Sequence, residues 1–139
     1  MRRSRPARPP LRAAAPPPPV GHNRPPEVRL AIVGSRTFSD ARLMASSLAE
    51  YVETAVIAIS GGADGADRMA MRWARSHGIE TLVFHPDHKR YRHPYHHRNR
   101  LIAEACTLLV AFWDGRSTGT KYTIDYARRI GREVRIVRF

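Results

Sequence analysis

One short stretch, ISGGADGAD at positions 59–67, constrains the fold of this chain more than any other. It follows an aliphatic, partly β-branched run at 55–59 and precedes apolar residues spaced three and four apart, which is typical of a helix. Its three glycines let the backbone approach a bound group closely, and the first N–H groups of a helix have no partner inside it. The stretch therefore predicts a strand, a tight turn and a helix N-terminus that can bind an anion.

The rest of the chain from residue 27 onward repeats this alternation of strand and helix. Further apolar runs at 28–33, 80–84, 107–113 and 133–137 have the length of buried strands, and a helical pattern separates each strand from the next. Strands that alternate with single helices pair in parallel through right-handed crossovers. We therefore expect an α/β fold, a doubly wound sheet of five parallel strands in the order 3-2-1-4-5.

In this order the strands at 28–33, 55–59 and 107–113 are neighbours. Parallel strands end at the same edge of a sheet, and ligands bind where the strand order reverses. We expect the turns after these three strands to form one pocket in which backbone amides, hydroxyls and arginines bind a phosphate. The candidate ligand-binding residues are Gly34, Ser35, Arg36, Ser60, Gly61, Gly62, Asp64, Asp67, Arg98, Asn99, Trp113, Asp114, Gly115, Ser117, Thr118, Gly119 and Thr120.

Several of these residues also have a structural interpretation. The glycines can serve tight packing, Thr118 can be a helix N-cap, and Arg36 can be a solvated loop residue. Asp64 and Asp67 could accept hydrogen bonds from ribose hydroxyls or simply cap the helix that follows them. Trp113 could stack on a nucleobase or pack against the core.

The first 26 residues have a different composition from the rest. They contain nine of the 11 prolines and six arginines but no acidic residue. Such a segment cannot bury enough apolar surface to offset the entropy of ordering, so we expect a disordered tail at 1–26 and one domain at 27–139. Half of the formal charge of +12 lies on this tail, which makes nucleic acid a possible partner of the tail.

The remaining composition limits the cellular context. The single cysteine, Cys106, supports no disulfide framework, and we find neither a secretory signal nor a run long enough to cross a membrane. We therefore expect a cytoplasmic protein without membrane contact. The histidines of the segment 85–97 match no tight ligand spacing, so we expect no metal site, and the sequence calls for no cofactor.

Several motifs together resemble one family. GSRTF at 34–38, the stretch 59–67, Arg98-Asn99, and FWDG at 112–115 followed by Gly119-Thr120 resemble the YspA-like branch of the SLOG superfamily. The resemblance covers essentially all of 28–139. It implies a Rossmann-like fold, a nucleotide-derived ligand that the protein binds or processes, and self-association into a homo-oligomer. The superfamily includes the Lonely guy phosphoribohydrolases and the DNA-processing protein DprA.

The likeness to Lonely guy enzymes can be followed residue by residue. Their functional arginine is matched by Arg98 and their Gly-Thr turn by Gly119-Thr120, whereas their catalytic glutamate falls on Thr123. Cleavage of an N-glycosidic bond needs a carboxylate, which threonine does not supply. Whether the protein is an enzyme therefore stays open, with Arg98, Asp64 and Asp67 as the catalytic candidates.

Three functions follow from these observations. The first is a module that senses or processes a phosphorylated, nucleotide-derived small molecule at the carboxyl edge of the sheet. The second is an N-glycosidic hydrolase of nucleoside monophosphates, in which Asp64 or Asp67 replaces the missing glutamate. The third is a DprA-like module that binds nucleic acid through its basic tail.

Overall fold

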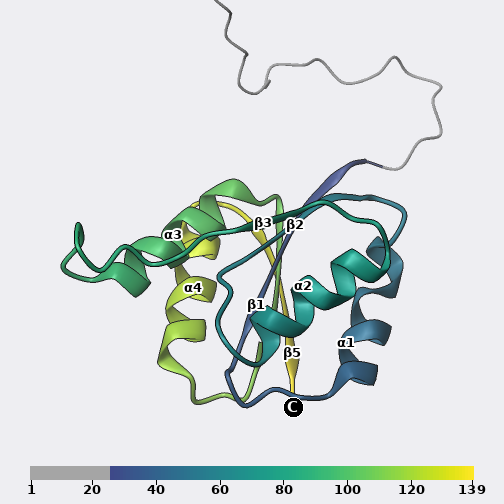
Figure 1. Cartoon of the computed structure of the whole chain (residues 1–139), viewed down its shortest axis with the longest axis horizontal. Coiled ribbons are helices and arrows are strands. Elements are labelled where there is room, and N and C mark those ends of the chain that lie inside the picture. The colour runs from purple at the N-terminus through teal and green to yellow at the C-terminus, as the bar shows by residue number, and fades with distance from the viewer. Residues whose placement is uncertain (1–25) are drawn as a thin grey trace, which may run out of the picture.

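The computed structural model describes residues 26–139, so all but the last residue of the tail expected at 1–26 lies outside the described residues. The strands and helices alternate along the chain as predicted (Figure 1). In order they are β1 (Val28–Gly34), α1 (Ala41–Leu48), the 3-10 turn η2 (Ala49–Tyr51), β2 (Ala55–Ser60), α2 (Ala66–Ser76), β3 (Thr81–Val83), α3 (Pro94–Ala105), β4 (Leu108–Trp113), α4 (Thr118–Arg129) and β5 (Glu133–Arg138).

The five strands form one parallel sheet in the order β3-β2-β1-β4-β5, which confirms the predicted fold class and strand order. β1 lies at the centre, where Leu30 pairs with Ala58 of β2 on one side and with Leu108 of β4 on the other. The strand order reverses between β1 and β4, which is where ligands bind in open α/β sheets.

The sheet separates two layers of helices. Figure 1 shows α1 and α2 on one side of the sheet and α3 and α4 on the other. Alternate residues of β1 point to the two sides, so that Leu30 and Ile32 pack with the α1 and α2 layer and Ala31 and Val33 with the α3 and α4 layer. Because both faces are covered, β1 and β4 are apolar along almost their whole length.

The strand bounds differ slightly from the expected ranges, most of all in the third strand. The third strand spans Thr81–Val83 rather than 80–84, since it is an edge strand that pairs only with the end of β2. The first helix begins after Asp40, whose Oδ1 accepts a hydrogen bond from the Leu43 N–H at 3.0 Å. No helix among residues 26–139 is both long and apolar enough to span a bilayer.

The ends of β1 and β4 are joined by hydrogen bonds. The Ser35 N–H donates to the Phe112 carbonyl at 2.9 Å, and the Asp114 N–H donates to Ser35 Oγ at 3.2 Å. A Cβ atom on Gly34 would overlap the Phe112 carbonyl oxygen and lie 2.8 Å from the Cβ of Ala66 on α2. Glycine at position 34 therefore allows β1, β4 and α2 to approach one another.

This close approach predicts a large effect of a single methyl group. We expect Gly34→Ala to lower the free energy of unfolding by about 2 kcal/mol or more, because the surrounding backbone must move to admit the Cβ. Gly119→Ala is the matched control, since a Cβ there meets no atom within 4 Å and alanine favours the first turn of a helix. Urea denaturation of both variants measures the difference, and equal stabilities would contradict the packing argument.

Candidate functional site

A cavity of about 440 Å³ lies at the carboxyl edge of the sheet, next to the ends of β1 and β4. Its walls come from segments that are far apart in the chain: the loop after β1, the turn after β2, the first half of α3, and the loop between β4 and α4 with the first turns of α4. The lining residues are Val33, Gly34, Ser35, Arg36, Thr37, Ala63, Asp67, Tyr95, Arg98, Asn99, Asp114, Ser117, Thr118, Gly119, Thr120 and Thr123.

The cavity brings together many of the residues predicted from the sequence. Those that line it are Gly34, Ser35, Arg36, Asp67, Arg98, Asn99, Asp114, Ser117, Thr118, Gly119 and Thr120. The predicted residues that do not line it are Ser60, Gly61, Gly62, Asp64, Trp113 and Gly115. The turns after β1, β2 and β4 thus meet around one pocket, while some of their residues have other contacts.

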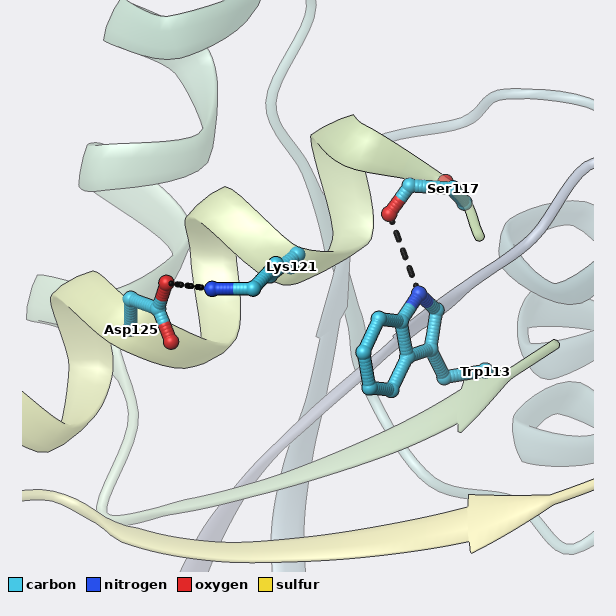
Figure 2. A network of polar contacts seen from close by, with 4 residues as sticks. All are labelled: Trp113, Ser117, Lys121 and Asp125. Carbon is cyan, nitrogen blue, oxygen red and sulfur yellow. Dashed lines mark hydrogen bonds and ion pairs between the residues drawn. The ribbon is translucent and has the colours of Figure 1, made fainter. Parts of the chain in front are cut away.

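The predicted residues outside the lining face neighbouring protein groups or solvent. Asp64 is largely exposed and forms an ion pair with Arg68, one helical turn away, at 3.0 Å. Trp113 donates its indole N–H to the Ser117 carbonyl at 3.0 Å, as Figure 2 shows, and the Arg138 guanidinium lies 5.4 Å from the centre of its ring. Trp113 therefore stabilises the loop before α4 through this hydrogen bond and does not line the pocket.

The remaining predicted residues outside the lining are small. Ser60 and Gly61 are buried beneath the turn after β2, and Gly62 is exposed on the side that faces His85. Gly115 has a positive φ of 84° and lies beside the Arg138 guanidinium. These residues shape the turns that carry the pocket lining.

The N-terminus of α4 presents free hydrogen-bond donors to the pocket. Ser117 is its N-cap, with Oγ accepting from the Thr120 N–H at 3.4 Å, and Asp114 Oδ1 accepts from the N–H groups of Arg116 and Ser117 at 2.8 and 2.9 Å. Among the described residues, the N–H groups of Thr118 and Gly119 have no acceptor. Free amides at the positive end of a helix favour a negatively charged group.

The N-terminus of α2 has some of the free amides that we predicted, but not all. We expected free amides after the glycine turn, but the Ala66 N–H donates to the Ser35 carbonyl at 3.3 Å and the Ala63 N–H donates to Asp67 Oδ2 at 3.3 Å. The Arg68 N–H is also used, by the Ala63 carbonyl at 3.0 Å. These partners use three amides of the turn, whereas the Asp67 N–H at the start of α2 has no acceptor among the described residues. The free donors at the pocket therefore come mainly from α4.

Arg98 is buried at the base of the pocket, which we call its floor, and is held there by hydrogen bonds. Its side chain is 6% exposed, and it donates from Nη1 to the Gly61 carbonyl at 2.6 Å and from Nε to Asn99 Oδ1 at 2.9 Å. A Cβ on Gly61 would lie 2.6 Å from Nη1, so the glycine at this position makes room for the guanidinium. The buried arginine thus links α3 to the turn after β2.

Asp67 is the buried carboxyl group of the pocket. Its burial raises its pKa to about 6, although the Ala63 N–H and the Arg98 charge oppose this shift. The pKa of Asp114 is lowered instead, because the N–H groups of Ser117 and Arg116 stabilise its charged form. A carboxyl group with a pKa near 6 can take up and release a proton close to neutral pH, as acid–base chemistry requires.

The position of the Lonely guy glutamate carries no acid in this pocket. Thr123 is buried and donates its hydroxyl to the Gly119 carbonyl at 2.9 Å, which ties it to the preceding turn of α4. Of the three catalytic candidates, Asp67 and Arg98 line the cavity and Asp64 does not.

Sequence reasoning missed five lining residues: Val33, Thr37, Ala63, Tyr95 and Thr123. Tyr95 is the most informative, because its ring is 46% exposed and lies 6.0 and 5.7 Å from the guanidinium carbons of Arg36 and Arg98. Its position one turn before Arg98, directly after the proline that begins α3, is a signal that could have placed it beside the pocket.

The histidines before and within α3 make aromatic contacts. The ring of His97 stacks on Tyr91 at 3.6 Å between centres, and the ring of His96 stacks on Tyr122 of α4 at 4.0 Å. In the part of the chain that the structure describes, no group of three or more His, Cys, Asp or Glu side chains could hold a metal ion.

The raised pKa of Asp67 predicts a pH dependence of stability. The folded protein binds the proton of the Asp67 carboxyl group more tightly than the unfolded chain does. Its contribution to the free energy of unfolding is therefore present at low pH and is lost as the pH rises through about 6. As the pH rises from 4 to 7, we expect the free energy of unfolding of Asp67→Asn to increase relative to that of the unsubstituted protein, by on the order of 3 kcal/mol. Urea denaturation across this range measures it.

Asp64→Asn is the matched control, since it makes the same change in the same turn on an exposed residue. Its stability relative to the unsubstituted protein should stay nearly constant over the same pH range. A constant difference for Asp67→Asn as well would show that Asp67 does not carry the pH dependence.

Comparison with known proteins gives both sequence and structural relatives. Residues 28–91 match the family described as YAcAr, the YspA, cpYpsA-related SLOG family. The Gene 61 protein of Mycobacterium phage D29 is 27% identical over 113 residues, which cover 74% of this chain and 90% of the phage protein.

Two DprA structures are similar in fold. DprA from Streptococcus pneumoniae superposes with a TM-score of 0.66 at 22% identity, over 80% of this chain and 50% of that chain. DprA from Helicobacter pylori, whose structure is described for its single-stranded DNA binding mode, gives 0.61 at 18% identity, over 77% of this chain and 63% of that chain. This chain therefore spans half of one DprA chain and less than two thirds of the other, and the likeness shows the fold.

The matched segment 28–91 contains the turns after β1 and β2 that form two walls of the pocket. This match supports the resemblance to the YspA-like branch of the SLOG superfamily that the motifs predicted, over residues 28–91.

Proposed function

We propose that this protein binds a phosphorylated, nucleotide-derived small molecule in the pocket at the carboxyl edge of the sheet. The observation that carries the proposal is the pair of free amides at the N-terminus of α4, Thr118 and Gly119, which open into a cavity that also holds arginine side chains. A phosphate at this position would accept hydrogen bonds from both amides and gain from the helix dipole.

The charge and size of the pocket support such a ligand. Arg36 lies exposed in the wall formed by the loop after β1, where its guanidinium can bind two phosphate oxygens at once. The Arg98 guanidinium adds a second positive charge from the floor. A volume of about 440 Å³ lies within the range of about 300–1,000 Å³ that is usual for small-molecule sites.

A screen for stabilising ligands tests the proposal directly. The full chain is heated with nucleoside mono- and diphosphates, ADP-ribose and cyclic nucleotides at millimolar concentration. Binding to the folded state alone raises the unfolding temperature, so at least one of these compounds should raise it. No shift with any of them would count against the proposal.

Substitution of Thr118 by proline tests the role of the α4 amide. Proline has no N–H but is well tolerated at the first position of a helix, which Thr118 occupies. We expect Thr118→Pro to weaken binding of the stabilising nucleotides by about 10-fold or more, because it removes a hydrogen bond to a charged group. Isothermal titration calorimetry measures the change.

Thr118→Ala is the control, because it removes the side chain but keeps the amide. It should bind these nucleotides within about threefold of the unsubstituted protein if the backbone N–H is the main contact. Equal losses in both variants would point to the hydroxyl instead.

Hydrolysis of an N-glycosidic bond stays the enzymatic alternative. Of its two candidate carboxyl groups, Asp64 and Asp67, the position of Asp67 supports it better. Asp67 lines the cavity and titrates near neutral pH, whereas Asp64 is paired with Arg68 outside it. Asp67 would then stabilise positive charge that develops on the sugar.

Single-stranded nucleic acid is the second candidate ligand, and the similarity to DprA favours it. The Helicobacter pylori protein is described as binding single-stranded DNA, and this chain carries a formal charge of +12. Binding through the basic tail predicts that affinity for an oligonucleotide falls steeply as salt increases and is mostly lost on deletion of residues 1–26. Fluorescence anisotropy measures both effects, and affinity that survives the deletion would place binding on the folded domain.

The expected cytoplasmic location and homo-oligomer stay predictions.

A further inference from the structure

The floor of the pocket holds a carboxylate and a guanidinium that do not form an ion pair. Asp67 and Arg98 are each 6% exposed, and both line the cavity. They flank Gly61, where an added Cβ would lie 2.9 Å from Asp67 Oδ2 and 2.6 Å from Arg98 Nη1. Within residues 26–139, however, no nitrogen of Arg98 lies within 4.0 Å of the carboxylate.

Both groups line the cavity and have atoms without a hydrogen-bond partner. Arg98 uses Nη1 and Nε for the Gly61 carbonyl and for Asn99, and its Nη2 has no acceptor among the residues described. The Asp67 carboxylate accepts the Ala63 N–H at 3.3 Å, and the Gly61 N–H and the Ser60 hydroxyl also lie close enough to stabilise its charge. Because a carboxylate can accept about four hydrogen bonds, it can still accept one from a ligand. Buried polar groups of this kind are costly unless a partner satisfies them.

The chemistry of this pair selects its partner. A phosphate beside Asp67 would be repelled by the carboxylate, and an amine beside Arg98 would be repelled by the guanidinium. A neutral hydroxyl group satisfies both, because it can donate to Asp67 and accept from Arg98. Two hydroxyls on neighbouring carbon atoms, as in ribose, would supply one for each side of Gly61.

Two other polar side chains of the lining already have partners in the protein. Asp114 accepts the N–H groups of Arg116 and Ser117, and Thr123 donates its hydroxyl to the Gly119 carbonyl. Asp67 is the buried carboxylate of the lining and lies beside Arg98, so it is the one that a hydroxyl donor at the floor would meet.

We propose that Asp67 and Arg98 form a subsite for the two hydroxyl groups of a ribose, so that the pocket selects ribonucleotides over 2′-deoxyribonucleotides. This inference rests on the proposed function, since the phosphate at the N-terminus of α4 places the sugar toward the floor. It also separates the pocket from a site for DNA, whose sugars lack the 2′-hydroxyl.

Matched pairs of nucleotides test the subsite without knowledge of the base. The full chain is titrated with AMP, CMP, GMP and UMP and with their 2′-deoxy forms, by calorimetry at pH 7.5. For every base that binds, we expect the ribonucleotide to bind about 10-fold more tightly or better, because the deoxy form leaves the charged groups without their partner. Equal affinities within the pairs would overturn the subsite while the phosphate site stands; no binding by any of the eight would overturn both.

Asp67→Asn identifies the residue responsible. Its amide keeps the shape of the side chain but lacks the charge and one acceptor, so we expect the preference for ribose to fall to about threefold or less with little change for the deoxy forms. Asp64→Asn should keep the full preference, since Asp64 lies outside the pocket. An unchanged preference for ribose in folded Asp67→Asn would overturn the assignment to Asp67. If this variant does not fold, the titration of the unsubstituted protein with the nucleotide pairs still tests the subsite.

Discussion

The pairing of β1 with β4 is the constraint on which the pocket depends. The helix that follows β1 packs on one face of the sheet and the helix that follows β4 packs on the other, so the two loops separate as they leave adjacent strands. Ser35 holds the two strand ends together. Its N–H donates to the Phe112 carbonyl, and its hydroxyl oxygen accepts from the Asp114 N–H. Gly34 allows that approach because it has no Cβ to meet the Phe112 carbonyl.

The charged groups around the cavity differ between its walls and its floor. Free amides and Arg36 stand on its walls, where a phosphate would gain hydrogen bonds and favourable charge interactions. Asp67 is buried at the floor, where the same phosphate would be repelled. A ligand with a phosphate at one end and neutral hydroxyl groups in its middle matches this order of charges, which is the arrangement of a nucleotide.

The alternation of strands and helices was readable from the sequence because the central strands β1 and β4 are covered on both faces and are therefore apolar along almost their whole length. The expected strand order was one of the usual orders of a doubly wound sheet, and the meeting of three loops at one edge followed from it. The loop residues were harder to assign. A glycine-rich turn looks the same in sequence whether its amides are free for a ligand or used by Ser35 and Asp67.

Local sequence also could not show which aromatic residue faces the pocket. Trp113 lies next to Asp114 at the end of β4 and was a candidate for base stacking, but its indole N–H reaches the Ser117 carbonyl (Figure 2). Tyr95 takes a place in the lining instead, because the first turn of α3 lies against the loop after β1 and beside Arg36.

The sequence by itself determined the fold class, the order of the strands and the edge of the sheet at which the polar turns gather, since hydrophobic pattern and chain handedness are local properties. The tertiary structure decided which of those polar groups are free. Whether an amide, a carboxylate or a guanidinium already has a partner depends on atoms that are tens of residues away in the chain, as for Arg98 and Gly61, and only the folded arrangement brings them together.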